Sequence, residues 1–169
     1  MGLGKTIQAL WWLKRHKELR PALIICPASL KLNWERETER VLGTIPQILN
    51  GRDDSQRIRE DIVIVNYDIL KNFHYLPERG VKISDLPPSA IDFHKFDLVI
   101  ADEAHYLKSS TSNRTKIFND FASRIPNRWF LTGTPITNKP IDFYNLLHMC
   151  ESPDRKSTRL NSSHTDISR

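Results

Sequence analysis

The stretch "FDLVIADEAH", residues 96–105, decides the fold of this chain because it joins a strand to a pair of carboxylates. Residues 97–101 form a nearly continuous apolar run, which is typical of a strand covered on both faces in a parallel sheet. Asp102 and Glu103 stand directly at the end of that run. Ligands of such sheets bind beyond the carboxyl ends of the strands, so we expect the two acids to belong to a binding site.

Outward from this stretch, strands and helices alternate along the chain. Short runs of aliphatic and β-branched residues predict three more buried strands, at residues 22–26, 61–66 and 128–131. Helical spacing of apolar residues predicts helices at residues 6–16, 30–42 and 112–122, and Pro140 could begin another that runs to Cys150. Either Ser112 or Ser110 could cap the third helix. This alternation predicts an α/β fold with a mainly parallel sheet flanked by helices.

Composition bounds the class of protein without naming its function. Of the 169 residues, 39% are hydrophobic and 27% are charged, which is typical of a globular domain. The apolar runs are too short to cross a membrane, and no signal peptide is visible, so we expect no membrane partner and an intracellular protein. Cys26 and Cys150 lack the spacing of a metal site or a disulfide framework. The net charge of +5 permits a nucleic-acid partner without requiring one.

Two segments have a different character from the rest. Residues 74–96 hold three prolines and a glycine without a sustained period, which favours an irregular loop or a small insertion. Residues 154–169, "DRKSTRLNSSHTDISR", contain too few large apolar residues to order themselves, and we expect a disordered tail there. This tail also resembles translated sequencing-adapter sequence, so an artefact and a natural tail are both open. We therefore expect one domain over residues 1–153.

The first ten residues, "MGLGKTIQAL", contain the end of a phosphate-binding loop. Gly4, Lys5 and Thr6 match the last positions of the pattern G-x-x-x-x-G-K-[ST], whose first position would fall before Met1. With Gly2 and Gly4 leaving the backbone open and a helix following, free N–H groups would face a phosphate. Lys5 would reach the β- and γ-phosphates, and the Thr6 hydroxyl would bind Mg²⁺. Taken alone, the tripeptide could equally be a turn before an amphipathic helix.

A magnesium nucleotide also needs a carboxylate from a neighbouring strand, and the acidic pair at the end of residues 97–101 supplies one. Asp102 is suited to hold Mg²⁺, directly or through water. Glu103 could polarise the attacking water as a general base. An isolated Asp-Glu pair would more simply be an acidic cap on the next helix, but the loop lysine and the α/β pattern favour the site.

Five segments together identify a resemblance to a known family. They are "MGLGKTIQAL", "ALIICPASLKLNWERE", "DIVIVNYDIL", "LVIADEAHYLKSSTSNRTKIF" and "FLTGTPITNKPIDFYNLL". In order and spacing they resemble the Swi/Snf-type DNA-dependent ATPases of helicase superfamily 2, over residues 1–153. DEAH-box RNA helicases share the letters "DEAH", but "LTGTP" argues against that branch. The resemblance implies a RecA-like P-loop domain, the N-terminal of two ATPase lobes.

The resemblance also implies roles for individual residues. Gly2, Gly4, Lys5 and Thr6 match the ATP-binding loop, with Thr6 and Asp102 as Mg²⁺ ligands and Lys5, Asp102 and Glu103 as catalytic residues. His105, Thr132, Gly133 and Thr134 match the motifs that couple phosphate state to DNA, and His105 is expected to hydrogen-bond toward the other three. Pro27, Ala28 and Ser29, with Asn66 and Tyr67, match segments on the DNA side.

The tryptophans carry no function in this interpretation. We expect Trp34 and Trp129 to be packing residues rather than platforms for base stacking. Trp11 and Trp12 are expected in the core or at an interface between lobes.

The function implied by the resemblance is ATP-driven movement on double-stranded DNA, with Mg²⁺, in a chromatin-remodelling or DNA repair and annealing motor. It would act in the nucleus of a eukaryote, or in the cytoplasm or nucleoid of a bacterium or phage. A strand-separating superfamily 2 helicase and a non-catalytic nucleotide- or DNA-binding module are the alternatives. In the family the opening reads "DEMGLGKT", so we expect an upstream strand, absent here, and a second RecA-like lobe with arginine fingers downstream. We expect residues 1–169 alone to be inactive.

Overall fold

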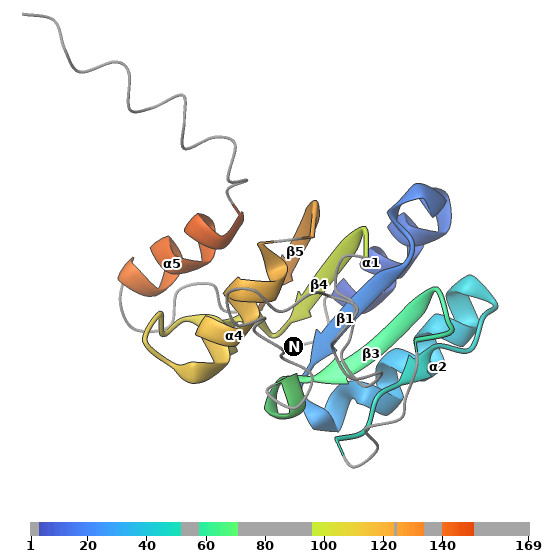
Figure 1. Cartoon of the computed structure of the whole chain (residues 1–169). Helices are drawn as coiled ribbons and strands as arrows, with labels where there is room; N and C mark the ends of the chain where they lie inside the picture. The colour runs from blue at the N-terminus through green and yellow to red at the C-terminus, as the bar shows by residue number, and fades with distance from the viewer. Residues whose placement is uncertain (1–3, 52–57, 71–95, 124, 134–139, 151–169) are drawn as a thin grey trace, which may run out of the picture.

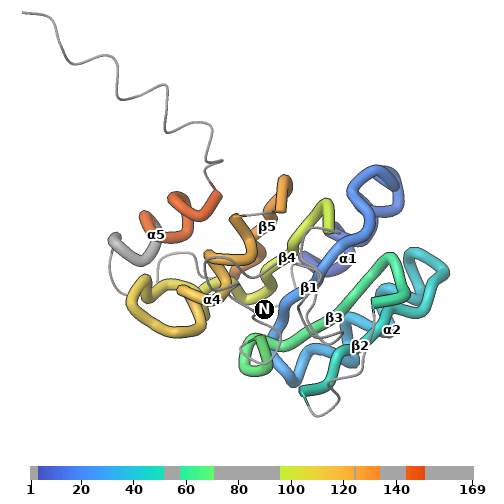
Figure 2. The backbone as a smooth tube through the Cα atoms, in the orientation of Figure 1, coloured from blue at the N-terminus to red at the C-terminus, as the bar shows by residue number. Residues whose placement is uncertain are grey.

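A parallel β-sheet forms the centre of the computed structural model, which describes residues 4–51, 58–70, 96–123, 125–133 and 140–150, with only the backbone of residues 140–143. Its strands in this part of the chain are β1 (Ala22–Cys26), β2 (Gln47–Ile48), β3 (Ile62–Asn66), β4 (Leu98–Asp102) and β5 (Asn127–Leu131). They lie in the order β2-β3-β1-β4-β5, and every pair is parallel. Figure 2 shows the short strand β2 beside β3 at one edge.

Helices cover both faces of the sheet (Figure 1). The α-helices are α1 (Lys5–Arg15), α2 (Lys31–Leu42), α4 (Asn113–Ala122) and α5 (Pro140–Cys150). Short 3₁₀ turns follow α1 and three strands: η1 (Lys17–Leu19), η2 (Ala28–Leu30), η3 (Tyr67–Ile69) and η6 (Ala104–Leu107). One buried cluster joins the sheet to α1 and α2, and another joins it to α4 and α5. The domain therefore has three layers, with the sheet in the middle.

Alternation along the strands explains how one sheet serves two cores. In β1, Leu23 and Ile25 belong to the cluster under α4 and α5, whereas Ile24 belongs to the cluster under α1 and α2. Successive side chains of a strand point to opposite faces, so a continuous apolar run fills both cores. The edge strand β5 differs, because its residues are exposed or only half-buried.

The predicted strands and helices are confirmed, with boundaries that move by about one residue. Ser112 caps α4, because its Oγ accepts a hydrogen bond from the backbone N–H of Thr115 at 3.2 Å. The strand β2 was missed, since two residues are too few to show a period. The predicted loop at residues 74–96 and the predicted tail at residues 154–169 lie outside the described residues, apart from the buried Phe96.

None of the described helices is long and apolar enough to cross a membrane.

The strand register brings the residues of the predicted site together at the carboxyl ends of the strands. Cys26 pairs with Asn66, and Asp102 pairs with Leu131. The carboxyl ends of these strands are therefore level, and the residues that follow them meet at the same edge.

Candidate nucleotide-binding site

The start of α1 presents an open helix N-terminus at the carboxyl edge of the sheet. Gly4 precedes the helix with φ 66° and ψ 22°, a left-handed conformation that glycine adopts without steric cost. Within the described ranges no side chain caps the helix by a hydrogen bond, and its first turn holds no acidic residue. The N–H groups and positive end of the helix dipole there suit an anion. Lys5 and Thr6 are half-buried, and Gly2 lies outside the described residues.

Glu103 lies between two basic side chains. Lys5 Nζ is 3.6 Å from Glu103 Oε1, and His105 Nδ1 is 3.1 Å from Glu103 Oε2. The His105 contact lacks the geometry of a hydrogen bond, and it becomes an ion pair only when the imidazole is protonated. Glu103 itself has φ 50° and ψ 49°, which is a rare backbone conformation for a residue with a side chain. The fold thus places the Glu103 carboxylate beside Lys5 at the cost of a strained backbone at Glu103.

Asp102 is the most enclosed acid of the site, with 4% of its surface exposed. Trp34 Nε1 donates a hydrogen bond to its Oδ2 at 2.9 Å, and the backbone N–H of Glu103 donates to its Oδ1 at 2.9 Å. The Tyr67 hydroxyl donates to its backbone oxygen at 2.8 Å. Burial, and next the charge of Asp102, raises the pKa of Tyr67 well above its usual value, so this hydroxyl stays protonated.

The segment after β5 also reaches the lysine. A Cβ atom added to Gly133 would lie 3.4 Å from Lys5 Nζ, so this glycine is within van der Waals distance of the end of the lysine. Thr132 is half-buried beside it, and Thr134 lies outside the described residues. His105 contacts Glu103, and its predicted hydrogen bond toward this segment stays a prediction.

The residues predicted on the DNA side have mixed exposure. Ala28 and Ser29 are exposed in η2 and Pro27 is half-buried, whereas Asn66 and Tyr67 are 7% and 4% exposed. Small exposed residues at a strand end can offer N–H and O–H donors to phosphates. The side chain of Tyr67 instead points inward to Asp102. DNA contact by both segments stays a prediction.

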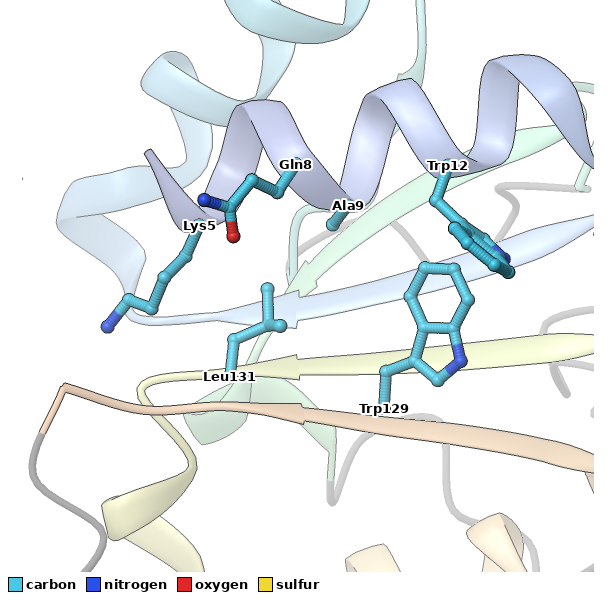
Figure 3. A pocket seen from close by; sticks show the side chains of 6 residues that line it. All are labelled: Lys5, Gln8, Ala9, Trp12, Trp129 and Leu131. Carbon is cyan, nitrogen blue, oxygen red and sulfur yellow. The ribbon is translucent and has the colours of Figure 1, made fainter. Parts of the chain in front are cut away.

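A hollow of about 340 Å³ lies between α1 and β5, lined by Lys5, Gln8, Ala9, Trp12, Trp129 and Leu131. Figure 3 shows Lys5 at one end of it, extending toward the carboxyl ends of the strands. Trp129 is half-buried there and Trp34 is fully buried, and both pack in the apolar cluster between the sheet and helices α1 and α2. Trp11 and Trp12 are 51% and 52% exposed, so a place in the core of this domain is wrong for them, and a place at an interface between lobes stays a prediction. The helix buries Ala9, Leu10 and Leu13 instead, and a helix turns its other faces outward.

These residues have the chemistry of a magnesium nucleotide site. Lys5 and the helix N-terminus suit phosphates, and Thr6 and Asp102 supply oxygen ligands. In the described part of the chain, no group of three His, Cys, Asp or Glu residues could hold a metal by itself. Mg²⁺ commonly takes only one or two protein carboxylates and completes its shell with phosphates and water, so this donor set fits it.

The family model of the SNF2-related domain matches residues 1–162. This chain belongs to the SNF2-related family. The SNF2-related chain is 32% identical over 149 residues to the mouse DNA annealing helicase and endonuclease ZRANB3, and 33% identical over 159 residues to an uncharacterized ATP-dependent helicase of Mycoplasma pneumoniae. These alignments cover 85% and 86% of the chain, but only 13% and 14% of the two relatives.

A solved structure confirms the fold of the SNF2-related chain. The SWI2/SNF2 ATPase core of Sulfolobus solfataricus, in complex with double-stranded DNA, superposes with a TM-score of 0.65 and 26% identity. The match covers 90% of this chain and 30% of that one. The chain is therefore an SNF2-family ATPase domain with a RecA-like parallel sheet flanked by helices.

Two contacts of this SNF2-related site were missed in the sequence. Trp34 and Tyr67 both bond to Asp102, yet the sequence predicted packing for the first and DNA contact for the second. Neither residue is near Asp102 in the sequence. A hydrogen bond between elements that are distant in the sequence leaves no local pattern. The available signal was position: Tyr67 directly follows β3, and Trp34 lies in the helix that comes after β1.

Proposed function

We propose that the whole protein is an ATP-driven translocase on double-stranded DNA, and that this chain holds part of its ATP site. The observation that carries the proposal is the meeting of Lys5, Asp102 and Glu103 at one edge of the sheet, next to the start of α1. A lysine that binds phosphates, a buried carboxylate that holds Mg²⁺ and a second group that orients water form a set that serves phosphoryl transfer to water.

Each residue has a separate task in this proposal. Bound Mg²⁺ would neutralise charge that develops on the phosphate oxygens. Lys5 and the N–H groups of α1 would bind the phosphates of ATP, and Thr6 and Asp102 would hold the ion. Glu103 would orient a water molecule and accept its proton. Lys5 Nζ lies 3.6 Å from Glu103 Oε1, so the proposed phosphate-binding cation and the proposed base stand side by side.

The DNA-side tasks rest on the resemblance and on exposure. Ala28 and Ser29 are exposed at the carboxyl edge of the sheet and would contact DNA phosphates, which position a protein without reading sequence. Thr132, Gly133 and Thr134 would link the ATP site to DNA, and Gly133 lies beside Lys5. The solved ATPase core with double-stranded DNA supports a duplex as the substrate. We expect action inside the cell, where such DNA is found.

The rate of hydrolysis would also depend on a second cation, which stabilises the charge that develops on the transferred phosphoryl group. We propose that a second RecA-like lobe of the whole protein supplies an arginine, whose effect in other phosphoryl-transfer enzymes is about 10³–10⁵ in rate. The match to only 30% of the solved ATPase core supports this proposal.

Phosphate release by the purified whole protein tests the proposal. We expect duplex DNA to stimulate release in the presence of ATP and Mg²⁺, and Lys5→Ala to abolish the stimulated part. Absence of any Lys5-dependent hydrolysis, with nucleotide still bound, would instead indicate a non-catalytic binding module.

A strand-separating helicase is a second candidate, because a relative from Mycoplasma pneumoniae is named an ATP-dependent helicase. Displacement of a third strand from a DNA triplex reports movement along a duplex, and release of a labelled strand from a forked duplex reports separation. We expect the first without the second. Separation of the fork at a comparable rate would favour the helicase.

A further inference from the structure

The indole of Trp34 is aimed at the carboxylate of Asp102 rather than at the backbone. Trp34 lies in α2 and is fully buried, and its Nε1 donates to Asp102 Oδ2 at 2.9 Å. A buried tryptophan N–H usually finds some acceptor. In this domain the acceptor is the acid that ends β4, which the proposed function makes a magnesium ligand.

The two oxygens of Asp102 are held by two N–H donors from different elements. Trp34 bonds to Oδ2, and the backbone N–H of Glu103 bonds to Oδ1, also at 2.9 Å. One donor leaves a carboxylate free to rotate about its Cβ–Cγ bond, but two donors fix its plane. Each oxygen still has a second lone pair for another partner.

The Trp34 ring is itself held in place. It belongs to the buried cluster that also contains Leu10 and Leu13 of α1 and Ile100 of β4. Side chains in such cores are close-packed and stay in their rotamers. The indole N–H is therefore a fixed donor, whereas Trp11 and Trp12 are about half exposed.

Hydrogen bonds are also the means by which the charge of Asp102 is stabilised. Asp102 is 4% exposed, and no ion pair reaches it from the described residues. A buried carboxylate without hydrogen bonds is costly. Loss of the indole N–H would remove one of two bonds to the carboxylate and leave its orientation to the Glu103 backbone alone.

We propose that Trp34 is a positioning residue, whose indole N–H orients the Asp102 carboxylate for Mg²⁺. The proposal rests on the proposed function, because it needs Asp102 to be the acid that holds the ion. Groups that orient metal ligands through a hydrogen bond typically change metal affinity or activity by about 10–100-fold when they are lost.

The test compares Trp34→Phe with the wild type in the whole protein, using a fluorescent ADP analogue as the probe. Phenylalanine keeps an aromatic ring in the core and lacks the N–H donor. We expect the Mg²⁺ concentration for half-maximal probe binding to rise about 10-fold. Probe affinity in EDTA should stay within about two-fold, because Lys5 and the start of α1 are unchanged. Trp11→Phe, on the exposed side of α1, should change neither value.

A positioning role also predicts which kinetic parameter changes. In Trp34→Phe, excess Mg²⁺ should restore most of the maximal hydrolysis rate, since the ligand is misaligned and not removed. Replacement of Trp34 by 3-benzothienylalanine keeps the size of the indole and loses only the N–H. It should reproduce the Mg²⁺ effect even if Trp34→Phe folds poorly.

Three outcomes separate this inference from the proposed function. If the benzothienylalanine variant binds Mg²⁺ and probe as the wild type does, the positioning role is wrong and the proposed function stands. If it loses rate equally at all Mg²⁺ concentrations, Trp34 is only structural. If Mg²⁺ does not affect probe binding in the wild type, the proposed function itself fails, and the inference fails with it.

Discussion

Lys5 and Glu103 face each other across the carboxyl edge of the sheet, with Nζ 3.6 Å from Oε1. Lys5 is the first residue of α1 and Glu103 follows β4, so this contact joins two residues that are far apart in the sequence. Both side chains are partly exposed, at 25% and 19%, so water screens their attraction. The pair matters less for stability than for where it places a cation and a carboxylate, side by side near the start of α1.

The left-handed backbone at Glu103 predicts that glycine is more stable than alanine at this position. A left-handed conformation costs a residue with a side chain roughly 1–2 kcal/mol, while glycine adds entropy to the unfolded chain. We therefore expect Glu103→Gly to be about 0.5–1 kcal/mol more stable than Glu103→Ala in urea unfolding. Both variants lose the carboxylate, so the comparison isolates the backbone. Equal stability would show that the turn is not strained.

The cap of α4 predicts a difference between two neighbouring serines. Ser112 Oγ accepts from the Thr115 N–H, so Ser112→Ala should lower the free energy of unfolding by about 1 kcal/mol. Ser110→Ala is the matched control, because Ser110 is exposed and lies outside the cap. It should change stability by less than about 0.5 kcal/mol. A larger loss for Ser110→Ala would move the start of the helix.

The two cysteines should differ in reactivity. Burial, and next the charge of Asp102, raises the pKa of Cys26 to about 12, and Cys26 is fully buried at the end of β1. Cys150 is exposed, although partial burial raises the pKa of its thiol as well. The thiolate is the reactive form, and at pH 8 its fraction at Cys26 is roughly 10⁻⁴.

Iodoacetamide labelling at pH 8, followed by peptide mass spectrometry, checks this difference. Cys26 should react at least about 100-fold more slowly than Cys150. Because the pKa of Cys26 is raised in the folded state, the unfolded thiol ionises first as pH rises. The thiol's contribution to folding is therefore complete below its unfolded pKa and is lost between that value and about 12. Comparable labelling rates in the folded protein would contradict the burial of Cys26.

The elements that could be predicted from the sequence are those whose signal is local. Residues 22–26 form a strand because five apolar residues fill both cores, and Ser112 caps a helix through a contact three residues away. The order of the strands did not follow from the alternation of strands and helices. The sequence indicated a parallel sheet, but the central place of β1, between β3 and β4, comes from pairing across the chain.

Candidate members of the site could be proposed from the sequence, but their contacts could not. Lys5, Asp102 and Glu103 follow from motifs whose chemistry is known, and the register brings their segments together. The hydrogen bond from Trp34 to Asp102 depends on how α2 packs on the sheet, which no local pattern encodes. The side of α1 that is buried was not predicted either, because it depends on how the helix packs on the sheet: Ala9, Leu10 and Leu13 are buried, and Trp11 and Trp12 are about half exposed.

A comparison of Lys5→Ala with Glu103→Gln in the whole protein tests the central claim, that these neighbouring residues bind and hydrolyse ATP by separate roles. Removal of the Lys5 cation should weaken ATP binding by at least about 10-fold. Glu103→Gln keeps the size of the side chain and loses its charge, so ATP should bind within about three-fold of the wild type, while DNA-stimulated hydrolysis falls by about 10²–10⁴-fold. Wild-type hydrolysis in Glu103→Gln, or unchanged ATP affinity in Lys5→Ala, would contradict the account.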